Sequence, residues 1–476
     1  MSDSELSLEG RAEAQFDDGI GRGRLARAAP VLGLTARTAG EAVVAGLRGA
    51  DRGEFHIRTA ERYAELLGRS RGALMKAGQM LSLTPANPAV PAEFWSIYRE
   101  ALARLRDDVP PMAGELAREV LEGELGCAAE GVFAEFDWEP LAAASIGQVH
   151  AARLRDGREV AVKIQYPGVA DAIAADLKNA ELLATFLSLV FGVVRSRPNL
   201  DLRGMAREMA ARIADELDYR REAAWQAEFA EIYRGHPCIH VPNVVAELCS
   251  SRVLTQQLVR GLAWSDALMA AQELRDSWAE AIFRFVYGTN ARFCLAHADP
   301  HPGNYVFHDD GSVSFLDFGC VKRFRREHVD ALGAIGNECV NGNVTGTWRA
   351  CVEASFVSSS APVEPVDAFT YFRGLTEMYW ASQPFTVTPE CAARWYENAV
   401  APTSSAAANA LRHSSPSPEY TVMIRVQLGV ASLIAQLHAG NHWQSIATEY
   451  FDRTPPLTEM GRRERAFFEH RWASFV

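Results

Sequence analysis

The chain has 476 residues, of which 48% are hydrophobic and 23% charged, and its formal net charge is −12. This composition is typical of a globular protein with more than one domain, so a fibrous or mainly disordered protein is excluded. The acidic balance disfavours nucleic acid as a partner, because its phosphates repel a negatively charged protein. The eight cysteines form no CxxC pair, which indicates reduced thiols rather than structural zinc or disulfides.

The N-terminal segment, residues 1–55, is expected to be disordered at its acidic start and basic from residue 20 to 48. It lacks the apolar run of a secretory signal, and the longest uncharged apolar run, residues 182–194, is too short to cross a bilayer. We therefore expect a cytoplasmic protein without a transmembrane helix. The basic stretch could lie on an anionic membrane surface as a peripheral contact, or it could pack as an ordinary helix.

Periodicity predicts the remaining elements. Helices are expected at about 57–83, 93–105 and 113–125, giving a helical N-terminal extension over 56–130. The period then changes, and residues 131–260 are expected to form a small lobe with strands at 136–141, 148–154, 159–164, 241–247 and 253–258 and helices at 171–194 and 201–233. Asp156-Gly157 predicts a hairpin turn between two of these strands. Residues 261–476 are expected to form a helical large lobe.

The most specific motif is His297-Ala-Asp299-Pro-His-Pro-Gly-Asn304, followed by Asp317-Phe-Gly319. In phosphoryl transfer one carboxylate orients the nucleophile, while an amide oxygen and a second carboxylate hold Mg²⁺ against the phosphates. The spacing of Asp299 and Asn304 is typical of a kinase catalytic loop. A hairpin of strands 304–307 and 313–316 is expected to return Asp317 beside Asn304.

A second motif, VAVKI at 160–164, supplies the strand lysine that kinase-like folds use against phosphate charge. Strand alternation places Lys163 and Ala161 on one face, where the small Ala161 leaves room for a flat base. An acid should orient the lysine, and three acids are spaced to share one face of the following helix: Asp215, Asp218 and Glu222.

The stretch Ala142-Ala143-Ala144-Ser145 occupies the place of the glycine-rich loop that covers the phosphates in protein kinases. Alanine disfavours positive φ, so we expect a stiffer loop and a different phosphate geometry. By analogy with kinase hinges, the backbone from Gln257 to Val259 is expected to bind adenine.

Five segments together resemble the UbiB/AarF-type atypical kinases, most closely the members that support coenzyme Q biosynthesis. They are KAGQ at 76–79, AAASIGQVH at 142–150, KIQYPG at 163–168, ELDY at 216–219 and HADPHPGN at 297–304. The resemblance covers about residues 55–345. It implies an α+β, protein-kinase-like two-lobed fold with a helical N-terminal extension, and ATP and Mg²⁺ as cofactors.

The resemblance also implies roles for single residues. The helix of Lys76, Gly78 and Gln79 would cover the active site as a regulatory element, with Lys76 contacting Glu216 and Asp218. Asp299 would be the base or water-orienting group, Asn304 and Asp317 the metal ligands, and Lys163 the phosphate-binding lysine set by Glu222. The residues expected to contact the nucleotide are Ala142, Ala143, Ala144, Ser145, Ala161, Lys163, Gln257 and Val259.

We therefore expect an atypical kinase or ATPase that transfers or hydrolyses the γ-phosphate of Mg-ATP in support of isoprenoid-quinone (ubiquinone-type) or related lipid metabolism. Expected partners are ATP or ADP, an anionic lipid or an isoprenoid-quinone precursor, and a second copy of the chain or a quinone-biosynthesis protein. Two alternatives remain. One is a small-molecule phosphotransferase of the aminoglycoside or choline kinase type, and the other is a non-catalytic module whose lipid or protein binding is gated by nucleotide.

Overall fold

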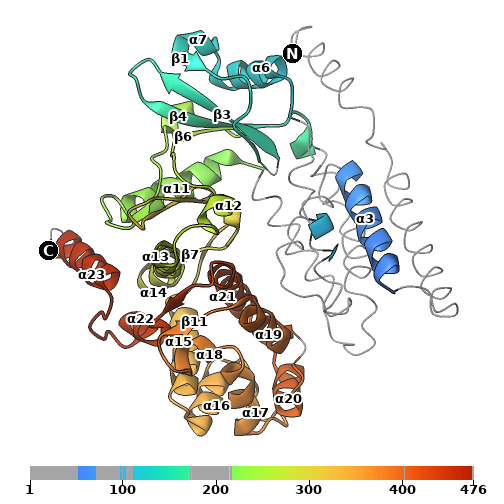
Figure 1. The fold of residues 1–476 in the computed structure, drawn as a ribbon, viewed down its shortest axis with the longest axis vertical. Coiled ribbons are helices and arrows are strands. Elements are labelled where there is room, and N and C mark those ends of the chain that lie inside the picture. The colour runs from blue at the N-terminus through green and yellow to red at the C-terminus, as the bar shows by residue number, and fades with distance from the viewer. Residues whose placement is uncertain are drawn as a thin grey trace. The chain divides into compact units, whose positions relative to one another are not determined.

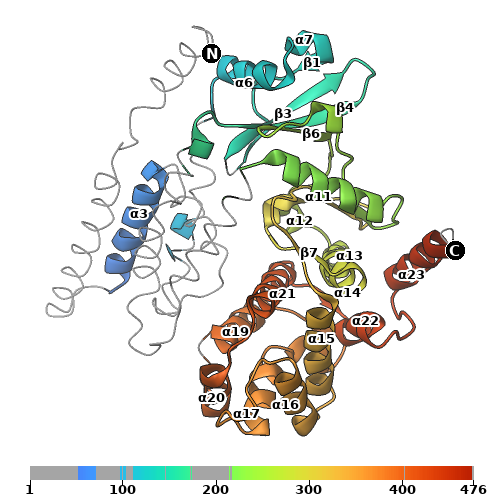
Figure 2. The same cartoon turned by 180° about the vertical axis from the view of Figure 1, so that it is seen from behind.

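The computed structural model describes residues 52–70, 97–98, 100–102, 111–144, 146–171, 173, 214, 217–400 and 402–473. The chain divides into two compact units. Unit 1 extends to Ala224 and includes Val244–Leu258, and unit 2 comprises Trp225–Asn243 and everything from Val259 onward (Figures 1 and 2). The basic stretch 20–48 and the KAGQ segment at 76–79, for which the sequence predicted a membrane contact and a covering helix, lie outside the described residues.

Unit 1 is built on an antiparallel sheet in the order β1-β3-β4-β6, with β2 beside the other end of β3. The strands are β1 Phe133–Phe136, β2 Ala142–Ala144, β3 Gly147–Leu154, β4 Glu159–Gln165 and β6 Val253–Gln257. The predicted strands at 148–154, 159–164 and 253–258 are confirmed to within a residue at either end. Gly157, with φ +90°, forms the predicted turn between β3 and β4.

Two strands predicted for the small lobe are wrong. Residues 137–141 lie between β1 and β2 instead of forming a strand, because Pro140 has no N–H for a ladder and the carbonyl of Asp137 is bonded by His150. Residues 241–247 make only an isolated bridge, between Val244 and Gln256, before a 3₁₀ turn begins at Ala246. Apolar runs of this length do not distinguish a strand from a packed loop.

The described helices of unit 1 are α3 Arg52–Ser70, α6 Gly114–Leu125, α7 Ala129–Val132 and the start of α11 Tyr219–Ile232. Helix α6 confirms the helix predicted at 113–125 and ends at Gly126, whose φ of +70° suits a left-handed cap. Its buried side chains join one core cluster with Val160, Val162 and Ile164 of β4. The sheet is therefore covered by α6 on the face opposite Lys163.

Unit 2 is mainly helical. Its elements before the hairpin that leads to Asp317 are β5 Ile239–His240, α12 Trp264–Ala267, α13 Gln272–Phe283, a π-helix at Arg284–Gly288, α14 Thr289–Phe293 and β7 Leu295–His297. The hairpin itself comprises a 3₁₀ turn at Pro302–Asn304, β8 Tyr305–Phe307 and β9 Val313–Phe315, followed by β10 Val321–Arg323. The predicted hairpin is thus confirmed.

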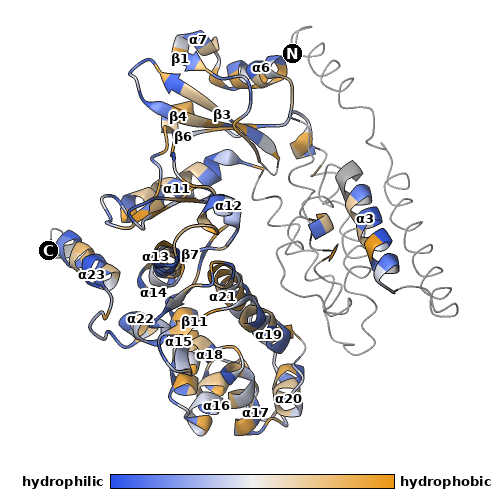
Figure 3. Cartoon of the chain, in the orientation of Figure 1, coloured by the Kyte–Doolittle hydropathy of each residue, from blue (hydrophilic) through white to orange (hydrophobic). Residues whose placement is uncertain are grey.

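The rest of unit 2 contains the elements α15 Arg326–Val340, α16 Val344–Glu353, α17 Pro365–Arg373, α18 Glu377–Trp380, β11 Phe385–Thr386, α19 Pro389–Val400, α20 Ser405–His413, α21 Pro418–Gln436, β12 Gly440–Asn441, α22 Trp443–Phe451 and α23 Glu459–Ala473. Helix α21 is rich in hydrophobic residues, whereas α23 is predominantly hydrophilic (Figure 3). Nine of the 19 residues of α21 are accordingly buried in the core of unit 2.

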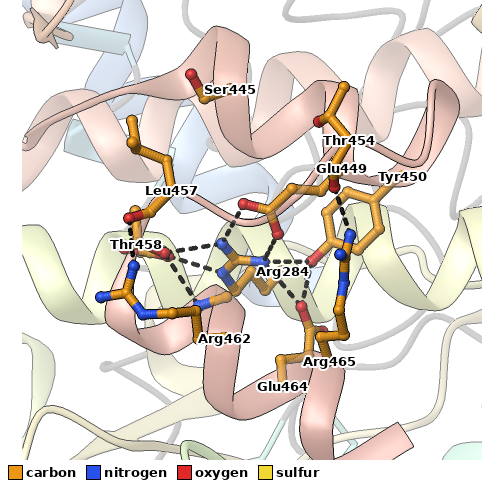
Figure 4. Close-up of polar contacts among 12 residues, drawn as sticks. Arg284, Ser445, Glu449, Tyr450, Thr454, Leu457, Thr458, Arg462, Glu464 and Arg465 are labelled. Carbon is orange, nitrogen blue, oxygen red and sulfur yellow. Dashed lines mark hydrogen bonds and ion pairs between the residues drawn. The ribbon is translucent and has the colours of Figure 1, made fainter. Parts of the chain in front are cut away.

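A buried ion cluster joins α13, α22 and α23 within unit 2 (Figure 4). The Arg284 side chain is fully buried, and its guanidinium lies 2.8 Å from a carboxylate oxygen of each of three glutamates: Glu280, Glu449 and Glu464. Arg292 adds a second cation 3.0 Å from Glu464. The hydrophilic α23 is therefore held to the helical core by charge as well as by apolar packing.

Among the described residues, no helix combines the length and apolar character that a membrane crossing requires. All eight cysteines are free thiols. Cys127 is exposed.

Candidate active-site residues

In unit 1 the strand lysine forms a buried ion pair. The Lys163 Nζ lies 2.9 Å from both carboxylate oxygens of Glu222, which belongs to the first turn of α11. The two side chains are only 13% and 5% exposed, and Nζ also lies 4.9 Å from the centre of the Tyr219 ring. Because β4 alternates, its valines pack under α6 and Lys163 occupies the other face, as predicted.

The face of the sheet that carries Lys163 holds both small and larger apolar side chains. Ala161 shares the strand face with Lys163, and its cross-strand partner is Ala151 of β3. The partner of Lys163 itself is Val149. Ala161 and Ala151 thus place two methyl groups one pair along from the lysine, whose own cross-strand neighbours are the larger Val149 and Leu254.

The alanine stretch is a strand rather than a loop, which corrects the prediction. Ala142, Ala143 and Ala144 form β2 and pair with Val149, Gln148 and Gly147 of β3. Cross-strand partners share a face of the sheet, so Ala142 is on the side of Lys163 and Ala143 is on the opposite side. Ser145 lies outside the described residues.

The end of the AAASIGQVH segment has a structural role that its sequence did not reveal. Gln148, fully buried, accepts a bond from the Met112 N–H at 2.9 Å, and its amide nitrogen lies 2.9 Å from His150 Nε2. His150 Nδ1 bonds to the Asp137 carbonyl at 2.8 Å, and burial lowers the pKa of the imidazole. Through these bonds the segment before α6, at Met112, is held to strand β3, and the histidine that takes part is neutral.

Gly147 is required by a close approach between strands. A Cβ at this position would fall 2.9 Å from the Ile164 carbonyl carbon and even closer to its oxygen, so only glycine fits. The glycine of this segment therefore serves the pairing of β3 with β4.

The position of Asp218 is a second correction. The sequence pattern predicted that it lies within a helix, but it precedes that helix. Helix α11 begins at Tyr219, and the Asp218 carboxylate accepts a bond from the Arg220 N–H at 3.0 Å. Asp218 thus caps α11 and does not share a helix face with Glu222, because short acidic side chains favour capping positions. Lys76, Gly78, Gln79, Asp215 and Glu216 lie outside the described residues.

Part of the backbone expected to bind adenine, from Gln257 to Val259, already makes hydrogen bonds within the sheet. Gln257 is the exposed last residue of β6 and pairs with Val160, and the next N–H, that of Leu258, donates to the Glu159 carbonyl at 3.1 Å. Val259 is half-buried and is the first residue of its unit 2 segment.

In unit 2 the catalytic-loop motif and the Asp317-Phe-Gly319 motif are joined through the backbone. Strand β7 pairs with β10, and the Ala298 N–H donates to the Cys320 carbonyl at 2.7 Å. The buried His297 contacts the Asp317 carbonyl through Nε2. The two motifs therefore lie side by side in unit 2, with His297 linking them.

The three polar residues expected to carry chemistry in unit 2 lie on this framework. The Asn304 amide nitrogen lies 3.1 Å from the Asp299 carbonyl and 3.2 Å from its carboxylate, so it fixes the loop and the side chain together. The Leu316 N–H donates to the Asn304 carbonyl, which brings the hairpin back to Asp317 as predicted. The Asp317 carboxylate accepts a bond from the Gly319 N–H at 2.9 Å.

The environment of Asp299 is partly apolar. Tyr305 is buried beside it, and burial, together with the nearby Asp299 charge, raises the pKa of the phenol. Asn304 is 8% exposed, whereas Asp299 and Asp317 are half-buried. The carboxylates therefore remain reachable on a rigid support.

The donor set of unit 2 fits a magnesium ion. Asn304 donates to Asp299 through its nitrogen, which leaves the amide oxygen for a hard cation, and Asp317 supplies a carboxylate. Within the described residues no group of three or more His, Cys, Asp or Glu could hold a metal by itself. Mg²⁺ commonly completes its shell with water and substrate phosphates, so a small protein donor set is suited to a metal that arrives with a nucleotide.

Helix α21 supports the catalytic loop, a contact that no motif indicated. Arg425 donates to the Ala298 carbonyl at 3.1 Å. Gly429 packs so closely on the Pro300 ring that an added Cβ would overlap it. Both residues are more than 120 positions from the loop, and no local pattern in the sequence predicts such a pairing.

This combination of sheet lysine, catalytic-loop motif and Asp-Phe-Gly motif defines a kinase-like protein. A family model described as the ABC1 atypical kinase-like domain matches residues 104–350, so the chain belongs to that family. The predicted UbiB/AarF-type membership and the α+β, kinase-like fold class are confirmed.

Curated relatives and a solved structure agree with this assignment. The chain is 35% identical over 273 residues to the mitochondrial atypical kinase COQ8B of Rattus norvegicus, covering 57% of this chain and 49% of the relative. It is 34% identical over 280 residues to an uncharacterised chloroplastic aarF domain-containing protein kinase of Arabidopsis thaliana, covering 58% and 37%. The chain thus matches half or less of the length of these relatives.

Among solved structures, the complex of Rv3197 with erythromycin from Mycobacterium tuberculosis matches with a TM-score of 0.59 and 31% identity. The match covers 82% of this chain and 95% of that one.

Proposed function

We propose that this protein binds Mg-ATP and transfers or hydrolyses its γ-phosphate. The observation that carries the proposal is the arrangement of Asp299, Asn304 and Asp317. The Asn304 amide nitrogen holds the Asp299 carboxylate, while the Asn304 amide oxygen and the Asp317 carboxylate are oxygen donors suited to Mg²⁺. The buried pair of Lys163 and Glu222 supports it, because a lysine held by a carboxylate is the cation that kinases use against nucleotide phosphates.

Each residue has a distinct role in this proposal. The Asp299 carboxylate accepts the proton of the attacking hydroxyl or orients a water, while Asn304 holds it in place. Asn304 and Asp317 bind the metal, which when present neutralises charge on the phosphates. Lys163 contributes a compact positive charge, and Glu222 keeps its Nζ in position. The alanines next to Lys163 would accommodate the base.

We further propose that the activity supports isoprenoid-quinone or related lipid metabolism, on the strength of the motif resemblance and of relatives named as COQ8 kinases. A lipid or quinone precursor as partner, a second copy of the chain and peripheral membrane contact belong to the same proposal.

The decisive experiment measures thermal stabilisation by Mg-ADP and Mg-ATP in wild type, in Asp317→Asn and in the control Asp309→Asn. Asp309 lies exposed at the hairpin tip, so the control makes the same change away from the cluster. We expect stabilisation of wild type and control that requires the metal and is lost in Asp317→Asn. Equal stabilisation of all three proteins would contradict the assignment.

A further inference from the structure

The aromatic ring of Tyr219 contacts the ammonium of Lys163 in unit 1. The Lys163 Nζ lies 4.9 Å from the ring centre, within the range of a cation–π contact, and 2.9 Å from both carboxylate oxygens of Glu222. Tyr219 is 1% exposed and the Lys163 side chain 13% exposed, so water is almost excluded from this contact. Cation–π attraction is strongest where both groups are desolvated. The ammonium therefore meets an aromatic face as well as a carboxylate.

Tyr219 is fixed to the sheet through the backbone around it. Its N–H donates to the Ser251 carbonyl at 3.0 Å, just before β6 begins. Two residues earlier, the Leu217 carbonyl accepts a bond from the Gln165 side chain at 3.2 Å. Gln165 follows Lys163 by two positions in β4, so both side chains are on the same face of the sheet. The segment that leads into α11 is therefore attached to β4 and to the residues before β6.

Packing fixes the Tyr219 ring as well. The ring belongs to a small core cluster that includes Leu254 and Ala223 and is separate from the cluster under α6. Leu254 is the cross-strand neighbour of Lys163 on β6, and Ala223 lies one turn further along α11. The sheet thus determines the position of the ring, whereas the lysine stem is flexible along its four carbons. The ring can therefore act as a rigid support for the lysine.

We propose that Tyr219 is a positioning residue for Lys163, whose ring fixes the ammonium beside Glu222 in the geometry that meets nucleotide phosphates. This inference rests on the proposed function for the role of Lys163. Glu222 provides the charge with which the ammonium pairs, but a carboxylate can pair with a flexible lysine in several orientations. The ring limits these orientations, because its attractive face lies on a side chain that the sheet already fixes.

The first test measures Mg-ADP affinity of the full chain by calorimetry. We expect Tyr219→Leu to bind about tenfold more weakly than wild type, and Tyr219→Phe, which keeps the ring, to stay within about twofold. Tyr219→Met is a second variant without the ring, and its flexible side chain fills irregular space in a core. The matched control is Phe133→Leu, which removes a ring 3% exposed in the other core cluster of unit 1 and should bind as wild type does.

A double-mutant cycle separates positioning of the lysine from a general loss of structure. If Tyr219 acts through Lys163, then Tyr219→Leu should have no further effect on Mg-ADP affinity in Lys163→Met, because the ring has no ammonium left to hold. A ring that only stabilised unit 1 would weaken binding by the same factor in both backgrounds.

The second test needs no nucleotide, so it separates failure of this inference from failure of the proposed function. The sequence has four lysines, Lys76, Lys163, Lys178 and Lys322, so the ammonium region of a spectrum of ¹⁵N-lysine-labelled protein is simple, and Lys163→Met assigns one signal. An ammonium that is buried and paired exchanges its protons slowly with water. We expect the Lys163 ammonium signal in wild type and Tyr219→Phe, and its loss through faster exchange in Tyr219→Leu and Tyr219→Met.

Three results would overturn the proposal. The first is wild-type Mg-ADP affinity in folded variants that lack the Tyr219 ring. The second is an equal loss of affinity on Tyr219→Leu in wild type and in Lys163→Met, which would make the ring a structural element only. The third is an unchanged Lys163 ammonium signal in both ring-free variants. If wild type itself does not bind Mg-ADP, the proposed function fails, and the ammonium signal alone decides whether Tyr219 holds Lys163.

Discussion

Replacement of Arg284 by methionine tests the buried ion cluster of unit 2. In the native protein two cations, Arg284 and Arg292, face three carboxylates: Glu280, Glu449 and Glu464 (Figure 4). Burial opposes ionisation of Glu464, but the Arg292 and Arg284 charges outweigh it and hold the pKa of this carboxyl below its ordinary 4.5. Arg284→Met leaves three buried carboxylates with one cation, so we expect at least one of them to take up a proton on folding.

The magnitude follows from that proton. A carboxyl that ionises at 4.5 when unfolded costs about 3.4 kcal/mol to protonate at pH 7, at 1.36 kcal/mol per pH unit. At pH 5 the same step costs about 0.7 kcal/mol. In the variant the carboxyl has a higher pKa when folded than when unfolded. The resulting loss of unfolding free energy is therefore full at pH values well above 4.5 and disappears as the pH falls toward 4.5. The native Glu464, whose pKa is lowered, keeps its contribution until the pH falls below 4.5.

The assay is urea unfolding at pH 5, 6 and 7, with the free energy of unfolding compared between Arg284→Met and wild type. Arg462→Met removes an exposed arginine of α23 that pairs with Glu459 and is the matched control, expected to stay within error of wild type. We expect the deficit of Arg284→Met to shrink by about 2.7 kcal/mol from pH 7 to pH 5. A variant as stable as wild type at pH 7, or a deficit that does not change with pH, would refute the reasoning.

Three further predictions concern single contacts. Gly147→Ala should lower the free energy of unfolding of unit 1 by about 1–3 kcal/mol, since the new methyl collides with the Ile164 carbonyl, and an unchanged urea midpoint would argue against this close approach. Gly429→Ala should displace Pro300 and reduce ATP turnover about tenfold or more with circular dichroism unaltered; full activity would show that the loop tolerates the shift. Asp299→Asn should lower ATP turnover about 100-fold while nucleotide affinity, measured by calorimetry, stays the same, and retained turnover would favour a non-catalytic nucleotide-binding module.

Local patterns predicted the parts of the fold whose determinants are local. Alternation in β4 gave the correct face for Lys163, and the turn at Gly157 and the hairpin before Asp317 followed from short-range signals. The pairing of Lys163 with Glu222, which the family resemblance implied, is present at 2.9 Å.

The features that sequence reasoning missed depend on distant partners. The alanines 142–144 were interpreted as a loop because their strand pairing is supplied by β3. Asp218 was placed on a helix face because spacing alone does not show where a helix begins. Arg284 contacts Glu464 across 180 positions, so its burial could not be read from its neighbours in the chain.

The support of the catalytic loop by α21 also constrains when the protein can acquire its final structure. The bond from Arg425 to Ala298 spans 127 positions, and the Gly429 contact with Pro300 spans a similar stretch. During synthesis the loop is therefore made long before the helix that supports it. Because chains emerge from the ribosome N-terminus first, we expect Asp299 to reach its final position only after α21 has been released. A nascent chain that ends before residue 418 would carry every catalytic motif and still lack the support that positions the loop.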